Sequence, residues 1–216
     1  DAVGAVLAGG DVTRSPGPVV VDVVVVGEAD APVLRRGARP GDGIWVTGEL
    51  GGAAAAVRVW SRGEAVPAGL RERFARPVPR LGAMAWLRAT GLVTSGMDLS
   101  DGLLQDAGHL AAASGLCMSL RAEQVPVSPA VRETLGEEEG LWAALSGGED
   151  YELVVTARPG LESHAEAFAR EVGVPLTRVG TVEAGEGARV LGPDGAPLSP
   201  PAVGFDHFPA RGPGAR

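Results

Sequence analysis

The stretch from Ser95 to Leu104, Ser-Gly-Met-Asp-Leu-Ser-Asp-Gly-Leu-Leu, constrains the fold more than any other part of the chain. Its first half is typical of a short strand, and its second half opens a helix after a glycine turn. The helix is indicated by small and apolar side chains at helical spacing, namely Leu103, Ala107, Leu110, Ala111 and Ser114. Gly115 is a typical C-terminal end for it. We therefore expect a strand-to-helix corner at residues 98–102.

Two carboxylates and a hydroxyl gather at this corner. Side chains two residues apart on a strand share a face, so Asp98 and Ser100 should point the same way. Asp101 stands where the helix needs its N-cap, and its carboxylate can accept backbone N–H groups there. An all-oxygen cluster of this kind suits a hard cation such as Mg²⁺. The alternative is that Asp101 only caps the helix, which is the commoner role for such a residue taken alone.

Charge and length exclude several classes of protein. The chain has 216 residues and a formal net charge of −8, so it offers no positive field to attract nucleic acid or an acidic membrane. The longest apolar run, Val19–Val26, is interrupted by Asp22 and is too short to span a bilayer. With no signal segment at its start and one cysteine, Cys117, the chain is expected to be cytoplasmic.

Strands and helices mix along the chain without strict alternation. Strands are expected at residues 19–27, 44–48, 92–97, 116–120, 153–156, 175–182 and 189–191. Helices are expected at residues 51–62, 81–90, 103–114, 141–145 and 162–172. The mixture predicts an α/β (α+β) layered fold, in which helices pack on a mixed β-sheet. The first strand is expected to be buried because β-branched residues fill it.

Two other glycine-rich stretches place acidic side chains at turns. In Gly9–Ser15, Asp11 follows a double glycine, where the backbone can approach a ligand closely and the carboxylate can join a metal site. In Ser146–Leu153, a double glycine places Glu149 and Asp150 at the entrance to a strand. The simpler alternative for both stretches is a polar turn with solvated side chains.

Basic and metal-binding residues give weaker signals. Arg35, Arg36 and Arg39 lie near a glycine and either hold phosphate through bidentate contacts or occupy a solvated turn. The three histidines show no zinc-ligand spacing. The chain also has no P-loop and no nucleophile elbow.

Six short motifs occur in the order found in a known family, and together they span nearly the whole chain. They are Gly9–Arg14, Arg39–Asp42 with Val46–Gly48, Arg73–Arg80, Met97–Leu103, Ser146–Leu153 and Gly204–Phe208. In these motifs the chain resembles thiamine-monophosphate kinase, a member of the ATP-binding superfamily of aminoimidazole ribonucleotide synthetase. Gly147–Leu153 and the Phe-Asp-His-Phe ending are the most family-specific.

The resemblance implies a phosphotransferase that converts thiamine monophosphate to thiamine diphosphate by direct, Mg²⁺-assisted transfer from ATP. It implies metal ligands at Asp11, Asp98 and Asp101, the last two being catalytic through the metal. The residues that it implies for ATP binding are Gly10, Asp11, Arg35 and Ser100, and those for substrate binding are Glu149 and Phe205.

The resemblance also implies a domain organisation. Residues 1–35 would be the remainder of an N-terminal ATP- and Mg²⁺-binding domain, residues 36–208 a PurM-like C-terminal α/β domain, and residues 209–216 a disordered tail. The family begins with a further segment of roughly a hundred residues, which we expect to be missing here. That segment resembles the family's dimer interface, so a homodimer formed through it is implied.

Two alternatives remain open. Another enzyme of the superfamily, such as selenophosphate synthetase, the hydrogenase-maturation dehydratase or a purine-pathway synthetase, would share the aspartate-rich site but use a different acceptor. A non-catalytic module that binds nucleotide or a partner would bind Mg-ATP without turnover. The Ser146–Leu153 motif favours the kinase.

Overall fold

The computed structural model describes residues 4–201 in two units, the first ending at Pro32 and the second beginning at Val33. Residues 4–32 contain no helix or strand, and their side chains are exposed. The prediction of a buried strand at residues 19–27 is therefore wrong: Val19 is 89% exposed and Val26 is also 89% exposed. A strand needs a hydrogen-bonded neighbour and a covering layer, and no other segment within residues 4–32 supplies either.

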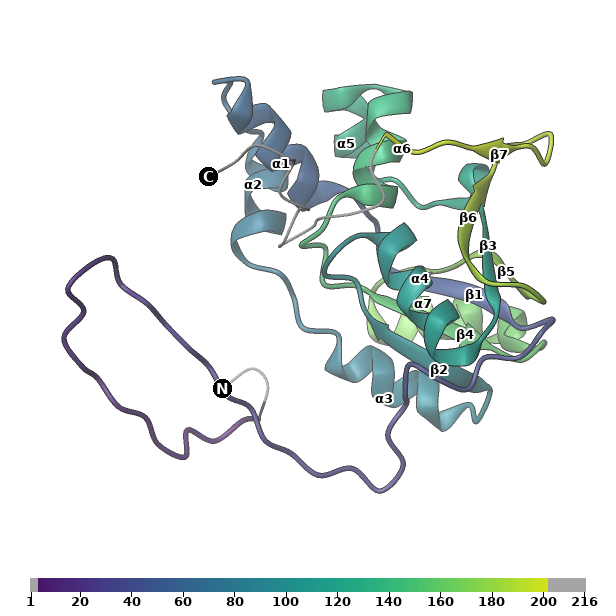
Figure 1. Ribbon diagram of the computed structural model, residues 1–216, viewed down its shortest axis with the longest axis horizontal. Coiled ribbons are helices and arrows are strands. Elements are labelled where there is room, and N and C mark those ends of the chain that lie inside the picture. The colour runs from purple at the N-terminus through teal and green to yellow at the C-terminus, as the bar shows by residue number, and fades with distance from the viewer. Residues whose placement is uncertain (1–3, 202–216) are drawn as a thin grey trace, which may run out of the picture. The chain divides into compact units, whose positions relative to one another are not determined.

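The second unit is built on one seven-stranded sheet in the order β2-β4-β1-β5-β3-β6-β7 (Figure 1). Its strands are Gly43–Thr47 (β1), Val93–Asp98 (β2), Cys117–Arg121 (β3), Leu153–Ala157 (β4), Leu176–Glu183 (β5), Gly187–Leu191 (β6) and Pro197–Leu198 (β7). Neighbouring strands are antiparallel except for β3 and β6, which run parallel. The predicted mixed sheet is confirmed.

Helices cover both faces of this sheet. They are Gly52–Ser61 (α1), Ala68–Ala75 (α2), Leu81–Ala89 (α3), Leu103–Ser114 (α4), Pro129–Leu135 (α5), Glu137–Ser146 (α6) and Ala165–Val172 (α7), with short 3₁₀ turns at Ala122–Gln124 (η1) and Leu161–His164 (η2). The larger core lies between the sheet and α1, α2, α4, α5 and α6, and the smaller one lies against α3 and α7. The predicted layered α/β arrangement is thus confirmed.

Strand β1 shows how the sequence pattern builds the two cores. Ile44 and Val46 point into the larger core, whereas Trp45 between them points into the smaller one. Strand β4 divides Val154 and Val155 between the same two cores. Side chains on a strand alternate between faces, so strands covered on both sides read as continuous apolar runs. At about 25 cal/mol per Å² of buried apolar surface, these two cores are the main stabilising contribution.

Several boundaries differ from the predictions. The helix expected at residues 141–145 is longer, because the acidic run at Glu137–Glu139 forms the first turn of α6. Helices α2 and α5 were not predicted. Acidic side chains favour the first turn of a helix, where they offset its dipole, so this run is a helix start rather than a solvated loop. Between residues 4 and 201, none of the helices is sufficiently long and apolar to traverse a membrane.

Candidate functional site

The predicted strand-to-helix corner is formed by the end of β2, a turn and the start of α4. Asp98 is exposed, Leu99 is buried, and Ser100 is partly exposed, which is the alternation that a shared face for Asp98 and Ser100 requires. Helix α4 ends at Gly115, whose φ of 65° is left-handed, as its position predicts. Within the described residues, no hydrogen bond or ion pair occupies the Asp98 carboxylate.

The predicted N-cap role of Asp101 is wrong. The N-cap of α4 is Gly102, with a φ of 112°, and a Cβ there would stand 3.0 Å from the carbonyl oxygen of Gly147. Only glycine fits this position. The backbone N–H groups of Ser100 and Asp101 instead donate to Oδ2 of Asp106, each at 3.1 Å.

Asp106 is a functional candidate that the sequence analysis missed. It is fully buried, and its Oδ1 has no hydrogen-bond partner among the described residues. Burial raises the pKa of Asp106 to about 6, although the N–H group of Asp101 acts in the opposite direction. The sequence did contain a signal for it, because Asp106 lies on the apolar stripe of α4, between Leu103 and Ala107. A charged residue at such a position must find a hydrogen-bond partner inside the protein.

The family-specific loop Ser146–Glu152 lies directly beside the corner. The N–H of Glu149 donates to the carbonyl of Ser100 at 2.9 Å, and the N–H of Tyr151 donates to that of Leu99 at 2.8 Å. Leu99 donates in return to the carbonyl of Glu152 at 2.8 Å. These bonds extend the antiparallel pairing of β2 with β4 beyond the strand ends. Glu149 and the corner are therefore held together by the backbone itself.

A cavity of about 540 Å³ opens between this loop, the corner and helix α1. One end is polar and is lined by Ser100, Asp101 and Glu149, while Val57 and Phe74 line an apolar wall. The Tyr151 hydroxyl donates to the carboxylate of Glu149 at 3.2 Å. Burial and the neighbouring Glu149 raise the pKa of the Tyr151 phenol. The cavity suits a ligand with an apolar ring system and a polar group that reaches the corner.

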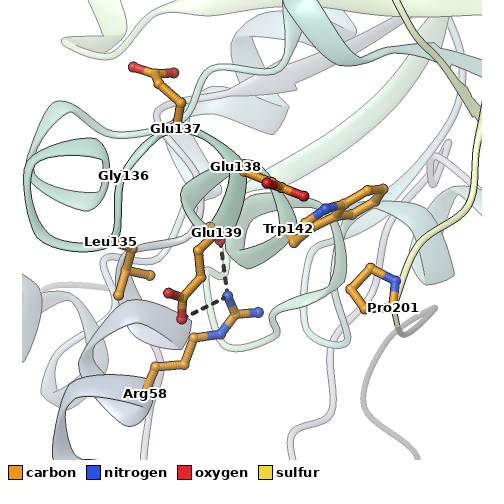
Figure 2. A pocket seen from close by; sticks show the side chains of 8 residues that line it. All are labelled: Arg58, Leu135, Gly136, Glu137, Glu138, Glu139, Trp142 and Pro201. Carbon is orange, nitrogen blue, oxygen red and sulfur yellow. Dashed lines mark hydrogen bonds and ion pairs between the residues drawn. The ribbon is translucent and has the colours of Figure 1, made fainter.

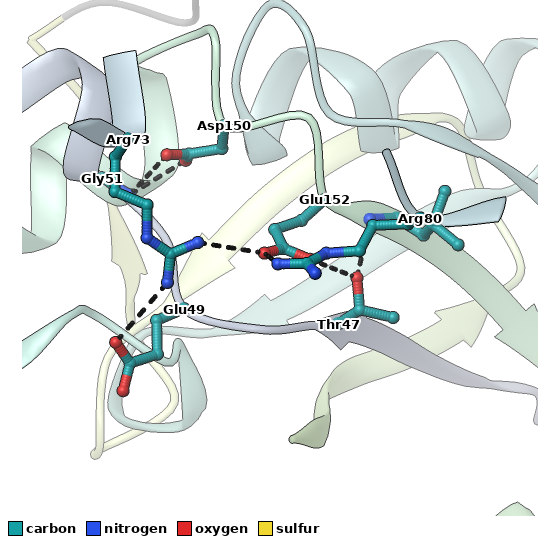
Figure 3. Close-up of polar contacts among 8 residues, drawn as sticks. Thr47, Glu49, Gly51, Arg73, Arg80, Asp150 and Glu152 are labelled. Atoms are coloured by element: carbon teal, nitrogen blue, oxygen red, sulfur yellow. Dashed lines mark hydrogen bonds and ion pairs between the residues drawn. The ribbon is translucent and has the colours of Figure 1, made fainter. Parts of the chain in front are cut away.

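Beside the loop, the buried Glu152 carboxylate binds Arg80, the Thr47 hydroxyl and the more exposed Arg73 (Figure 3). Glu152 is 1% exposed. Nearby, Asp150 accepts the N–H of Gly51 at the start of α1, and burial raises its pKa to about 7. Neither role was predicted, because the partners are far apart in sequence.

A second hollow of about 600 Å³ holds none of the predicted site residues (Figure 2). It is lined by Arg58, Leu135, Gly136, Glu137, Glu138, Glu139, Trp142 and Pro201. Its arginine is already engaged, since Arg58 donates to the backbone carbonyl of Glu139 at 3.0 Å. This hollow is a weaker site candidate than the cavity at the corner.

For the remaining predicted site residues, no contact described within the second unit joins them to the corner. Gly10 and Asp11 lie in the first unit, and both are exposed. Arg35 is exposed in the segment before β1. Phe205, with the predicted tail, falls outside the described residues. The roles assigned to these four residues stay predictions.

The fold and the corner correspond to a known family. The family model described as "AIR synthase related protein, C-terminal domain" matches residues 39–192. The chain belongs to this family. Within it, the chain is 36% identical over 208 residues to a thiamine-monophosphate kinase of Salmonella typhimurium, and 36% identical over 210 residues to one of Escherichia coli K12. Each alignment covers 94% of this chain and 63% of the relative, so this AIR synthase related chain spans less than two thirds of the relatives' length.

Solved structures lead to the same family. The thiamine-monophosphate kinase of Stenotrophomonas maltophilia K279a superposes with a TM-score of 0.69 at 38% identity, covering 77% of this chain and 54% of that one. AaThiL complexed with AMPPCP and TMP gives a TM-score of 0.66 at 32% identity, covering 82% and 54%. Escherichia coli HypE, at 22% identity and a TM-score of 0.64, shares the fold.

Proposed function

We propose that this chain phosphorylates thiamine monophosphate to thiamine diphosphate with ATP. The observation that carries the proposal is the joining of Ser100, Asp101 and Glu149 in one cavity, in a chain that aligns with thiamine-monophosphate kinases over 94% of its length. The other superfamily enzymes use different acceptors, and HypE is similar at a level that supports the fold alone. The structure of AaThiL with AMPPCP and TMP supports the substrate pair.

The shape of the cavity suggests how the acceptor would be placed. Thiamine monophosphate carries two aromatic rings, one of them cationic, and a phosphate. The rings would lie against Val57 and Phe74, with the cationic ring near Glu149, and the phosphate would face Ser100. We assign Glu149 to substrate binding on this basis and on the resemblance of its motif, and Phe205 on the resemblance of its motif alone.

The chemistry requires positioning more than proton transfer. The acceptor phosphate has a second pKa near 6 and is largely dianionic at neutral pH, so it needs no general base. The problem is the repulsion between two anions, and the Ser100 hydroxyl and the Arg35 guanidinium can donate to phosphate oxygens. Asp98 and Asp101, together with Asp11, would hold Mg²⁺, which neutralises phosphate charge when bound. The fit is supported by an Asp98 carboxylate that carries no competing contact within the described residues.

The wider organisation follows from the same family. We assign residues 1–35 to an N-terminal ATP- and Mg²⁺-binding domain that contributes Gly10, Asp11 and Arg35 to ATP binding. Residues 36–208 form the PurM-like C-terminal domain, and residues 209–216 are a tail. A cytoplasmic homodimer, without nucleic-acid or membrane partners, completes the proposal.

The direct test is product formation. The chain and its full-length gene product are each incubated with Mg-ATP and thiamine monophosphate, and thiamine diphosphate is measured by chromatography. Product from either one supports the kinase. ATP consumption with a different acceptor would assign another superfamily reaction, and Mg-ATP binding without any turnover would assign a non-catalytic module.

The metal assignment is tested with Asp98→Asn and Asp101→Asn in whichever form is active. We expect each to lower kcat by at least about 100-fold while the melting temperature stays unchanged, because loss of one charged ligand removes a few kcal/mol of transition-state stabilisation. Asp194→Asn, an exposed aspartate in the β6–β7 turn, is the control. Near-normal turnover in both corner variants would remove the assignment.

A further inference from the structure

The loop that carries Glu149 adopts a backbone that must be held in place. Glu149 has a φ of 69° and Tyr151 a φ of 50°, both in the left-handed region that non-glycine residues seldom occupy. Its three backbone bonds to residues 99–100 fix the side of the loop that faces the corner. Asp150 ties the loop to α1 through the N–H of Gly51, and a further set of side-chain contacts meets at Glu152.

The Glu152 carboxylate accepts hydrogen bonds from donors in three other segments (Figure 3). Arg80 binds it through both ends of its guanidinium, with Nε 2.7 Å from Oε2 and Nη2 2.5 Å from Oε1. The Thr47 hydroxyl, at the end of β1, donates to Oε2 at 2.7 Å and accepts the N–H of Leu153 at 2.9 Å. Arg73 lies at 3.4 Å and is shared with Glu49. Two fixed donors on one planar group hold a carboxylate in a single orientation.

The surroundings are shaped to fit this carboxylate. A Cβ at Gly48 would collide with Glu152, so the backbone passes where only glycine leaves room. The Arg80 side chain is only 12% exposed, and solvent therefore screens the pair little. The contact also spans 72 residues, and it ties the extended connector before α3 to the loop.

We propose that Arg80 is a positioning residue that holds the 146–152 loop against the corner through Glu152, and so sets the affinity for thiamine monophosphate. The inference rests on the proposed function, because Glu149 is the loop's link to that substrate. The corner itself is held separately by Asp106 and by the pairing of β2. Loss of Arg80 should therefore weaken binding of the acceptor much more than binding of ATP.

The loop position can be read without any activity assay. Tyr151 is the only tyrosine in the sequence, so 3,5-difluorotyrosine labels the loop alone and should give one ¹⁹F resonance. We expect Arg80→Met to shift or broaden this resonance and Arg80→Lys to have a smaller effect, since a lysine cannot make the bidentate contact. Arg178→Met is the matched control, because Arg178 pairs with Glu162 at 3.4 Å on the surface. An unchanged resonance in Arg80→Met would overturn the proposal.

Kinetics then separates positioning from stability. Arg80→Met alone leaves a buried charge and can fail to fold, so the double variant Arg80→Met/Glu152→Gln removes both charges. We expect the double variant to recover a near-normal melting temperature and to raise KM for thiamine monophosphate at least tenfold. KM for ATP should change less than about threefold. If the double variant instead has normal KM values for both substrates as well as normal stability, the pair of Arg80 and Glu152 is merely structural and the proposal is wrong. If neither the unmodified chain nor its full-length gene product makes thiamine diphosphate, the proposed function fails, while the fluorine spectrum still decides whether Arg80 holds the loop.

Discussion

Helices α1 and α4 have similar N-termini, but they differ in where the carboxylate that accepts the backbone N–H groups there comes from. For one helix it lies nearby in the sequence, and for the other it lies far away. Each follows a glycine of positive φ, Gly51 at 89° and Gly102 at 112°, and neither has a side-chain cap of its own. At α4, Asp106 reaches back from the same helix to the two amides before it. At α1, Asp150 arrives from a loop 99 residues away and accepts the N–H of Gly51. One start is thus locally encoded, and the other forms only when the tertiary structure does.

The comparison also concerns charge. Burial raises the pKa of Asp106 to about 6 and that of Asp150 to about 7. For both carboxylates, burial disfavours the charged form, and hydrogen bonds from backbone amides offset part of that cost. Asp106 supports the corner proposed to bind metal and phosphate, whereas Asp150 ties the neighbouring loop to α1. The two starts thus brace the cavity from two sides.

The largest expected effect is the loss of Asp106. Asp106→Ala leaves the partly buried amides of Ser100 and Asp101 without their acceptor, and we expect it to lower the free energy of unfolding by about 3 kcal/mol. Asp150→Ala removes the acceptor at the start of α1, and about 1 kcal/mol is expected, which is the typical cost of losing a helix cap. Urea unfolding measures both, with Asp194→Ala as an exposed control. A larger loss in Asp150→Ala would reverse the ranking and make the long-range cap the dominant one.

The glycines give a second and smaller effect. An alanine Cβ at Gly51 would stand 3.0 Å from the Ala144 nitrogen, and one at Gly102 would stand 3.0 Å from the Gly147 oxygen. Each adds positive-φ strain to this crowding, so we expect Gly51→Ala and Gly102→Ala to cost about 2 kcal/mol each. Their activities should differ, because only Gly102 adjoins the proposed metal ligand Asp101. Equal losses of kcat in two variants of equal stability would mean that the corner is no more sensitive than α1.

The same contrast explains what the sequence predicted. The corner, α4 and its end at Gly115 follow from spacing within about 20 residues, and the structure contains them. The face shared by Asp98 and Ser100 follows from strand alternation alone. The N-cap was placed one residue early, because the approach of Gly147 that reserves Gly102 for glycine is a tertiary contact. Local signals therefore predicted the corner but not the contacts that hold it.

The parts that were missed depend on distant partners. The pair of Arg80 and Glu152 spans 72 residues, and neither residue carries a local signal of burial. Helix α2 has one buried residue, Leu70, so its apolar pattern is too weak to predict a helix. At residues 19–27 the pattern was strong, but the described chain supplies no partner strand. An apolar pattern shows that a segment can form a strand, but the strand forms only where neighbouring segments pair with it and cover it.

The last expected effect, spread over several pH units, is the pH dependence that Asp150 adds. Because its pKa is raised in the folded state, the folded protein binds this proton more tightly than the unfolded chain does. Stability relative to Asp150→Asn should therefore be highest below pH 4, fall as the pH rises to about 7, and stay level above that. Part of the Asp150 residue is exposed, so we expect a total change on the order of 2 kcal/mol, about half of what the full pKa shift would give.

Asp106 is unchanged in this pair of proteins, and its own titration cancels when the two unfolding curves are subtracted. The measurement is urea unfolding of both at intervals from pH 4 to 8. A flat difference across that range would mean that Asp150 titrates normally. The start of α1 would then be held by the Asp150 hydrogen bonds without any cost of burying the charge, and the likeness of the two helix starts would be limited to backbone geometry.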